Sequence, residues 1–156
     1  MAAANKTKVT RPITNIRKII DRLETVHPDA KLDLDFTNPL ELLIALILAA
    51  QARDDLVNQV TIPLFKNYRT AEDYARAPLP ALQEQIRKIN FYRNKAKSIH
   101  NCCSDIVARY EGKVPDRLDD LVSLPGVGRK TANMVLGNAF GRQAIGVDTH
   151  VMRLSQ

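Results

Sequence analysis

The segment TNPLELLIALILAA, residues 37–50, limits the possible folds more than any other part of the chain. Asn38, followed by Pro39 and by Glu41 three residues later, is typical of a helix start, because the asparagine side chain can accept a first-turn N–H and proline fits the first position. The helix that follows is apolar on nearly every side, and its run LLIALILAA is too short to cross a bilayer. Such a helix has to be enclosed by other helices, so we predict that it lies at the centre of the core.

The rest of the chain repeats apolar residues at helical spacing, and no segment alternates with period two. We therefore predict an all-α fold with about eight to ten helices. The expected helices lie at residues 13–28, 37–50, 54–68, 79–89, 91–112, 115–124, 129–140 and 149–156, with a short one after Thr70. In the first of these, a wide apolar face begins at Ile13. Residues 1–11 are small, polar and basic, and we expect a flexible basic tail there.

Charge and cysteine content narrow the function. The chain has 156 residues, of which 45% are apolar, and a net charge of +6, with a pI of about 9.5. This balance indicates an acidic partner, with nucleic acid ahead of a membrane surface. Cys102 and Cys103 are adjacent and no metal-ligand spacing occurs, so we expect reduced cysteines and no metal site. The first residues lack the apolar stretch of a signal peptide. We expect a soluble intracellular protein of the cytoplasm or nucleoid.

Residues 119–140, DDLVSL-PGVG-RKTANMVLGNAF, read as helix, four-residue hairpin, helix. Gly126 and Gly128 permit positive φ and leave no side chain to hold a ligand off the backbone. The amides of the hairpin, Val127 included, would then point outward with those of the second helix and bind a phosphate. A bound phosphate would also explain two cations, Arg129 and Lys130, at a helix start that disfavours them. The alternative is a tight turn between two helices, with no ligand.

Lys130 has two possible roles that its spacing does not separate. It could contact a phosphate, or its amine could act as a nucleophile, activated by neighbouring positive charge. Asp148, eighteen residues later, could simply cap the helix that follows it. The short loop between them could also bring its carboxylate beside the amine, where the pair could do base and nucleophile work. His150 has no partner that would make it a base, and we expect it to be structural.

Taken together, LPGVGRKTANMVLGNAFG and VDTHVMRL resemble the endonuclease III family of helix-hairpin-helix DNA glycosylases and abasic-site lyases. The similarity continues upstream in PLELLIALILAAQARDDLVNQV, FYRNKAKSI and GKVPDRLDDLVSLPGVG, and covers roughly residues 15–154. It implies a six-helix lobe at residues 37–142, with the helix-hairpin-helix at 116–140. Residues 12–36 would be the N-terminal helix of a second lobe and its connection. Residues 143–156 would be the loop and helix start that carry the catalytic aspartate.

The resemblance also implies roles for individual residues. Lys130 would attack C1′ of a damaged nucleotide, Asp148 would assist it, and a Schiff base and β-elimination would follow. The partner would be duplex DNA with damaged bases or abasic sites, and the nucleotide would have to leave the stack. Gln51 and an apolar wedge, Phe91 with Ile89 beside it, would fill the space that the nucleotide leaves in the duplex. The remaining residues expected to contact DNA are Arg93, Lys95, Gly126, Val127, Gly128 and Arg129. For Phe91, the alternative is an ordinary core residue at a helix start.

Four features depart from the family pattern. Arg53 follows the glutamine loop, Asn90 replaces a glycine before the wedge, and Gln143 stands where a proline is usual. The fourth is the end of the chain at Gln156: family members continue through further helices and commonly bind a [4Fe–4S] cluster with four cysteines. We therefore expect a chain truncated at its C-terminus, with the iron–sulfur lobe mostly missing and no cofactor encoded in it. If the chain is complete, we expect a monomer.

Three functions fit these observations. The first is a bifunctional glycosylase and abasic-site lyase acting on oxidised pyrimidines in base-excision repair. The second is a relative with another lesion preference, although adenine-specific relatives generally lack the lysine. The third is a catalytically weak or inactive truncated helix-hairpin-helix module that only binds DNA. The presence of both Lys130 and Asp148 favours catalysis.

Overall fold

The computed structural model describes residues 15–154, and every regular element in that range is a helix. This confirms the all-α prediction, and the nine helices among these residues match the expected number. The predicted tail at 1–11, Ile13 and the last two residues lie outside the described part. The chain divides into two units, Met1–Leu32 and Asp33–Gln156. No helix among the described residues is both long and apolar enough to cross a membrane.

In the first unit the described regular element is α1 (Ile16–Val26), whose apolar residues recur at helical spacing, as predicted. None of its residues is buried. The second unit begins before the predicted lobe boundary at residue 37. Leu34 is buried, and the Asn58 side chain binds both its neighbours, accepting from the Asp35 N–H at 2.9 Å and donating to the Asp33 carbonyl at 2.8 Å.

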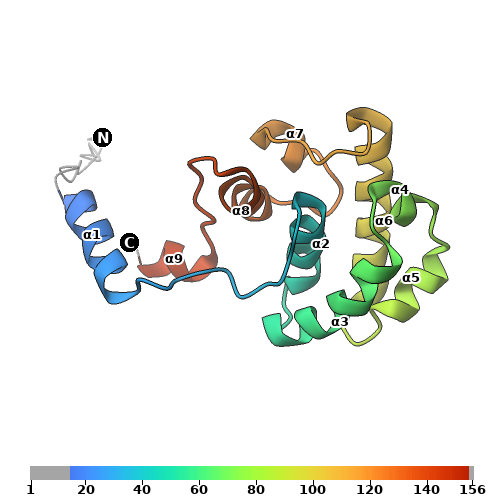
Figure 1. The fold of residues 1–156 in the computed structure, drawn as a ribbon, viewed down its shortest axis with the longest axis horizontal. Helices are drawn as coiled ribbons and strands as arrows, with labels where there is room; N and C mark the ends of the chain where they lie inside the picture. The colour runs from blue at the N-terminus through green and yellow to red at the C-terminus, as the bar shows by residue number, and fades with distance from the viewer. Residues whose placement is uncertain (1–14, 155–156) are drawn as a thin grey trace, which may run out of the picture. The chain divides into compact units, whose positions relative to one another are not determined.

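At the centre of the second unit lies α2 (Pro39–Ala49), where all residues from 42 to 48 are buried. Its start is built as the sequence predicts: Asn38 Oδ1 accepts the Glu41 N–H at 3.0 Å, and the Glu41 carboxylate accepts from Thr37. It packs against α3 (Asp54–Asn67), α6 (Tyr92–Tyr110) and α8 (Arg129–Phe140), and Figure 1 shows it between α6 and α8. The prediction of a central core helix is confirmed.

Two short helices, α4 (Ala71–Arg76) and α5 (Leu79–Gln85), cover α6. Thr70 and Asp73 form a reciprocal capping box at the start of α4. The helix expected at 79–89 is shorter than predicted, because α5 ends at Gln85. Ile86 and Ile89 are both buried, and a turn in which the Ile89 N–H donates to the Ile86 carbonyl at 2.9 Å directs both inward.

α6 is the longest helix among the described residues, and it carries both cysteines in the core. Cys102 and Cys103 are free, as predicted, and burial raises the pKa of the Cys102 thiol to about 12, so it stays protonated. After α6, the chain forms α7 (Leu118–Val122), the hairpin, α8 and finally α9 (Thr149–Leu154). α7 packs on α8, which gives the predicted helix-hairpin-helix.

Candidate functional site

The hairpin between α7 and α8 is a tight turn seated on α6. Gly126 has φ +78°, and a Cβ there would lie 2.8 Å from the Ser98 Cβ, so glycine is needed both for the turn and for the close approach to α6. Gly128 differs from the prediction: its φ is −87°, which any residue can adopt. Val127 was also predicted wrongly as a phosphate contact. Its side chain is buried and its N–H donates to the Leu124 carbonyl at 3.1 Å.

The start of α8 is open to an anion. Gly128 caps the helix without a side-chain hydrogen bond, and its carbonyl accepts the Ala132 N–H at 2.9 Å. The amides of residues 129–131 therefore have no acceptor within the helix. Arg129 and Lys130 are both exposed in this first turn. Free amides, the positive end of the helix and two cations together suit a DNA phosphate.

The structure brings Lys130 and Asp148 together. Lys130 Nζ lies 3.8 Å from Asp148 Oδ2, and the two side chains are 50% and 33% exposed. Both side chains are thus partly exposed at the surface, where a substrate can approach them. The distance allows proton exchange after a small side-chain movement, and it leaves the amine free to approach a carbon atom.

The loop 141–148 returns to α8 through specific contacts. Asn133 Nδ2 donates to the Ile145 carbonyl at 3.0 Å, and a Cβ at Gly146 would lie 2.6 Å from Cγ of Met134. At the start of the loop, Arg142 pairs with Asp116. The sequence indicated that the loop could return to the start of α8, but it did not identify the residues that hold the loop there. Gly146 could have been noticed as a glycine two residues before Asp148, whereas nothing in the local sequence marked Asn133.

Asp148 both caps α9 and faces Lys130, so the two interpretations of this residue are compatible. Its Oδ1 accepts the Val151 N–H at 2.9 Å, and its carbonyl accepts the Met152 N–H at 2.9 Å. The hydrogen bond from Val151, and then the charge of Lys130, hold the pKa of Asp148 below its usual value. The carboxylate is therefore ionised at neutral pH. Its second oxygen faces the lysine.

The loops predicted to fill the space of an extruded nucleotide lie side by side. Gln51 and Phe91 are both exposed, Phe91 at 64%, and both adopt a left-handed backbone with φ near +57° and +58°. Asn90 Nδ2 donates to the Gln51 carbonyl at 3.4 Å, which links the two loops. Arg93 is exposed and stacks over the Tyr92 ring at 5.1 Å. An exposed phenylalanine fits a wedge and excludes the core alternative.

Besides Val127, two further residues of the predicted DNA surface are buried, Ile89 and Lys95. Ile89 is only 1% exposed, because the turn after α5 directs it into the core, so its prediction as part of the wedge is wrong. Lys95 is 8% exposed, and its ammonium donates to the Leu48 and Ala50 carbonyls at 2.8 and 2.6 Å. It therefore binds the end of α2 and cannot contact a phosphate directly. Its charge alone had suggested a DNA phosphate as its partner.

The residues present do not fit a [4Fe–4S] cluster. Such a cluster takes four cysteine thiolates, whereas the chain has two cysteines, both buried on α6. Between residues 15 and 154, no three side chains of histidine, cysteine, aspartate or glutamate gather in a way that could hold a metal ion.

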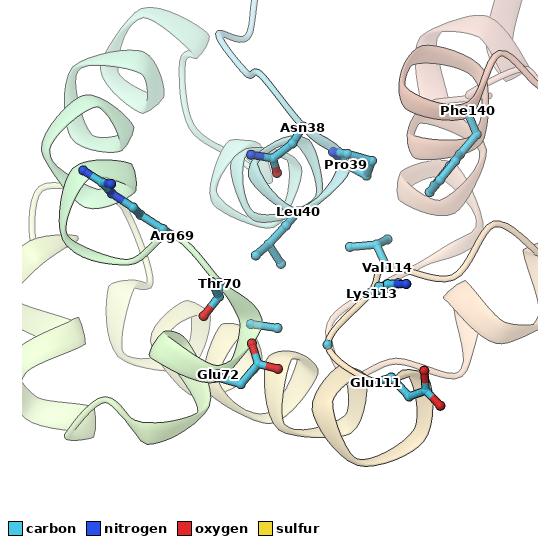
Figure 2. A pocket seen from close by; sticks show the side chains of 12 residues that line it. Asn38, Pro39, Leu40, Arg69, Thr70, Glu72, Glu111, Lys113, Val114 and Phe140 are labelled. Carbon is cyan, nitrogen blue, oxygen red and sulfur yellow. The ribbon is translucent and has the colours of Figure 1, made fainter.

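A pocket of about 480 Å³ lies between the starts of α2 and α4 and the ends of α6 and α8, lined among others by Asn38, Thr70, Lys113 and Phe140. Figure 2 shows its lining side chains. None of the predicted site residues lines it. Phe140 ends α8 ten residues after Lys130, which places it about 15 Å along the helix axis. This pocket is therefore separate from the lysine and aspartate.

Comparisons with known proteins identify the family to which the chain belongs. Residues 44–156 match the family described as HhH-GPD superfamily base excision DNA repair protein. Endonuclease III of Bacillus subtilis (strain 168) is 48% identical over 145 residues, covering 91% of this chain and 66% of that protein. Endonuclease III of Synechocystis sp. (strain ATCC 27184 / PCC 6803 / Kazusa) is 47% identical, covering 86% of this chain and 62% of that protein. The chain thus spans slightly less than two thirds of the length of these relatives.

Solved structures show the same fold. A trapped endonuclease III–DNA covalent intermediate superposes with a TM-score of 0.86 at 49% identity, over 94% of this chain and 68% of that one. A thermostable thymine-DNA glycosylase superposes with a TM-score of 0.82 at 24% identity, which supports the fold alone. The predicted helix-hairpin-helix glycosylase fold and the predicted resemblance are confirmed.

Proposed function

The chain belongs to the HhH-GPD superfamily of base excision DNA repair proteins, and we propose that it excises damaged bases from duplex DNA and cleaves the abasic site. The observation that carries the proposal is the pair formed by Lys130 Nζ and the Asp148 carboxylate, 3.8 Å apart at the start of the hairpin's second helix. An amine and a carboxylate, at a helix start whose free amides suit a phosphate, are the groups that attack on a sugar carbon requires.

In the proposed reaction, Asp148 accepts a proton from the Lys130 ammonium, and the free amine forms a bond to C1′. The N-glycosidic bond breaks, and its electron pair leaves with the base, which takes up a proton. Opening of the sugar ring at the C1′–O4′ bond gives a Schiff base, with O4′ protonated to a hydroxyl. Loss of a proton from C2′ then expels the 3′ phosphate, and water hydrolyses the imine to release the lysine.

The N-terminal end of α8 would hold the DNA backbone during this reaction. The free amides of residues 129–131 and the exposed Arg129 side chain would bind phosphates beside the lesion. The nucleotide must leave the duplex for its C1′ to be reached, and Gln51 and Phe91 would occupy the space it leaves. A relative of this chain has been trapped as a covalent complex with DNA, which supports the same chemistry here.

We propose oxidised pyrimidines as the preferred lesions, as the resemblance to endonuclease III implies. The test compares duplexes containing one thymine glycol, one 8-oxoguanine or no lesion. We expect nicking of the thymine glycol strand well above that of the other two. Nicking of the oxidised purine instead would assign another lesion class. Binding without nicking of any duplex would favour the DNA-binding module over the enzyme.

Removing the side chain of Gln51 or of Phe91, which would occupy the space left by the extruded nucleotide, should weaken recognition of damaged DNA. Gln51→Ala and Phe91→Ala should each lower affinity for a duplex with an abasic-site analogue more than for an undamaged duplex, by up to a few kcal/mol, the cost of holding a nucleotide out of the stack. Both side chains are exposed, so folding should change little. Fluorescence anisotropy with both duplexes measures the difference. Equal losses on the two DNAs would show that these residues contact only the backbone.

A further inference from the structure

Lys95 is a buried cation for which the proposed reaction has no use. Its residue is 8% exposed, and burial lowers the pKa of its ammonium. The ammonium donates to the Leu48 carbonyl at 2.8 Å and the Ala50 carbonyl at 2.6 Å. A buried charge carries a desolvation cost, which these two hydrogen bonds offset. Through these hydrogen bonds the cation can hold neighbouring segments of the chain in place.

One element that it holds is the end of α2. The last carbonyls of a helix have no N–H donors of their own, and a cation at that end is favoured by the helix dipole. The chain then turns sharply: the Ala52 N–H donates to the Ala49 carbonyl at 3.0 Å, and Gln51 takes φ +57°. A residue other than glycine persists in this conformation only when its surroundings fix it. The Lys95 ammonium binds the Ala50 carbonyl, which immediately precedes Gln51.

The other element is the loop that carries Phe91. The backbone N–H of Lys95 donates to the Phe91 carbonyl at 3.0 Å, as the first hydrogen bond of α6. Phe91 itself has φ +58°. A second connection joins the loops directly, since Asn90 Nδ2 donates to the Gln51 carbonyl at 3.4 Å. Through its side chain and its backbone, Lys95 is therefore bonded to both loops.

We propose that Lys95 is a positioning residue that joins the Gln51 and Phe91 loops, so that the two side chains enter the DNA as one unit when a nucleotide is extruded. This inference rests on the proposed function, because it concerns how that function recognises damage. Lys95 touches no reacting atom in this role. Its effect passes through Gln51 and Phe91, and a variant that loses it should discriminate less well between damaged and intact DNA.

A double-mutant cycle separates this role from a general effect on folding. Affinities for a duplex with a tetrahydrofuran abasic analogue and for an undamaged duplex are measured for wild type, Lys95→Met, Gln51→Ala and the double variant. We expect Lys95→Met to lower the ratio of the two affinities about tenfold in the wild-type background and less than twofold in the Gln51→Ala background. An equal effect in both backgrounds, or an unchanged ratio, would overturn the proposal.

Lys88→Met is the matched control, since Lys88 is an exposed cation seven residues earlier and the substitution changes the net charge equally. It should lower both affinities together, through lost counterion release, and leave their ratio unchanged. A fall in the ratio equal to that of Lys95→Met would mean that charge, and not the bonds to the loops, explains the result. Urea unfolding confirms that each variant is folded under the binding conditions.

If Lys95→Met does not fold, a second cycle still decides the matter with two exposed residues. Loops that act as one unit predict that Gln51→Ala and Phe91→Ala together lower the affinity ratio little more than either alone. Losses that simply multiply would overturn the proposal. The wild-type protein distinguishes the two levels of failure. If it does not prefer the abasic duplex, the proposed function fails, whereas preference with independent losses removes only the role of Lys95.

Discussion

Lys130→Gln is expected to abolish strand cleavage and covalent trapping while leaving DNA binding nearly intact. Lys130 Nζ is the amine beside Asp148, at 3.8 Å, and the glutamine amide cannot form a Schiff base. Binding should persist because the amides at the start of α8 do not depend on this side chain. Loss of one phosphate contact would reduce the slope of log affinity against log salt by about 0.9. Single-turnover cleavage of an abasic duplex and a salt titration measure the two effects.

Arg129→Gln is the control for this variant, because Arg129 is the neighbouring exposed cation in the same turn. It should reduce the salt slope by a similar amount and still form a trapped complex at saturating protein. If Lys130→Gln continued to form the covalent adduct, the nucleophile would be a different residue. If both variants lost binding equally and neither lost trapping, Lys130 would be a phosphate contact.

Asp148→Asn should slow base removal by about 10² to 10⁴-fold, the usual contribution of a positioned general acid or base. The substitution separates the two roles of Asp148. Asparagine is as good a helix cap as aspartate, so its side-chain oxygen can still accept the Val151 N–H. The charge facing Lys130 is lost. Circular dichroism and thermal unfolding should therefore change little, while single-turnover glycosylase rates fall steeply.

Asp148→Ala completes this comparison, because it removes both the charge and the cap. It should slow the reaction as much as Asp148→Asn and, in addition, destabilise α9. A rate close to wild type in Asp148→Asn, with a loss in Asp148→Ala, would mean that only the cap matters.

The pH dependence gives a related expectation. The hydrogen bond from Val151 and the charge of Lys130 lower the pKa of Asp148 in the folded protein. Because this pKa lies below the unfolded value of about 3.9, Asp148 stays ionised from pH 5 to 8, and a change in rate within that range would belong to another group. The lowered pKa also contributes stability to the folded protein, which is present above the unfolded pKa and is lost as pH falls through the folded pKa. In the range where Asp148 stays ionised, Asp148→Asn should accordingly change the height of the pH–rate profile and not its shape.

Much of the fold followed from local pattern, because helix caps and apolar spacing act over a few residues. The Asn38 cap and the capping box at Thr70 were predictable in this way. Such features depend on neighbours in the sequence, and the sequence displays such neighbours directly. The pairing of Lys130 with Asp148 was one of two alternatives that the sequence left open, because it depends on the contacts of Asn133 and Gly146 that return the loop to the start of α8.

What could not be predicted depends on contacts between distant segments. Lys95 looked like a phosphate contact because its charge is visible in the sequence, whereas the carbonyls that bind it lie 47 and 45 residues earlier. Ile89 looked like part of a wedge, but a turn that no local signal marked carries it into the core. Val127 was expected to contact a phosphate, but its N–H donates to the Leu124 carbonyl instead. This hydrogen bond depends on the detailed geometry of the turn.

Identifying the residue that becomes bonded to DNA would show whether the Lys130 amine attacks the sugar. The protein is incubated with a duplex containing one abasic site in the presence of borohydride, which reduces a Schiff base to a stable amine. The trapped complex is digested with nuclease and protease, and the modified peptide is sequenced by mass spectrometry. We expect a single adduct on Lys130. An adduct on any other lysine, or no adduct on a duplex that the protein demonstrably binds, would contradict it.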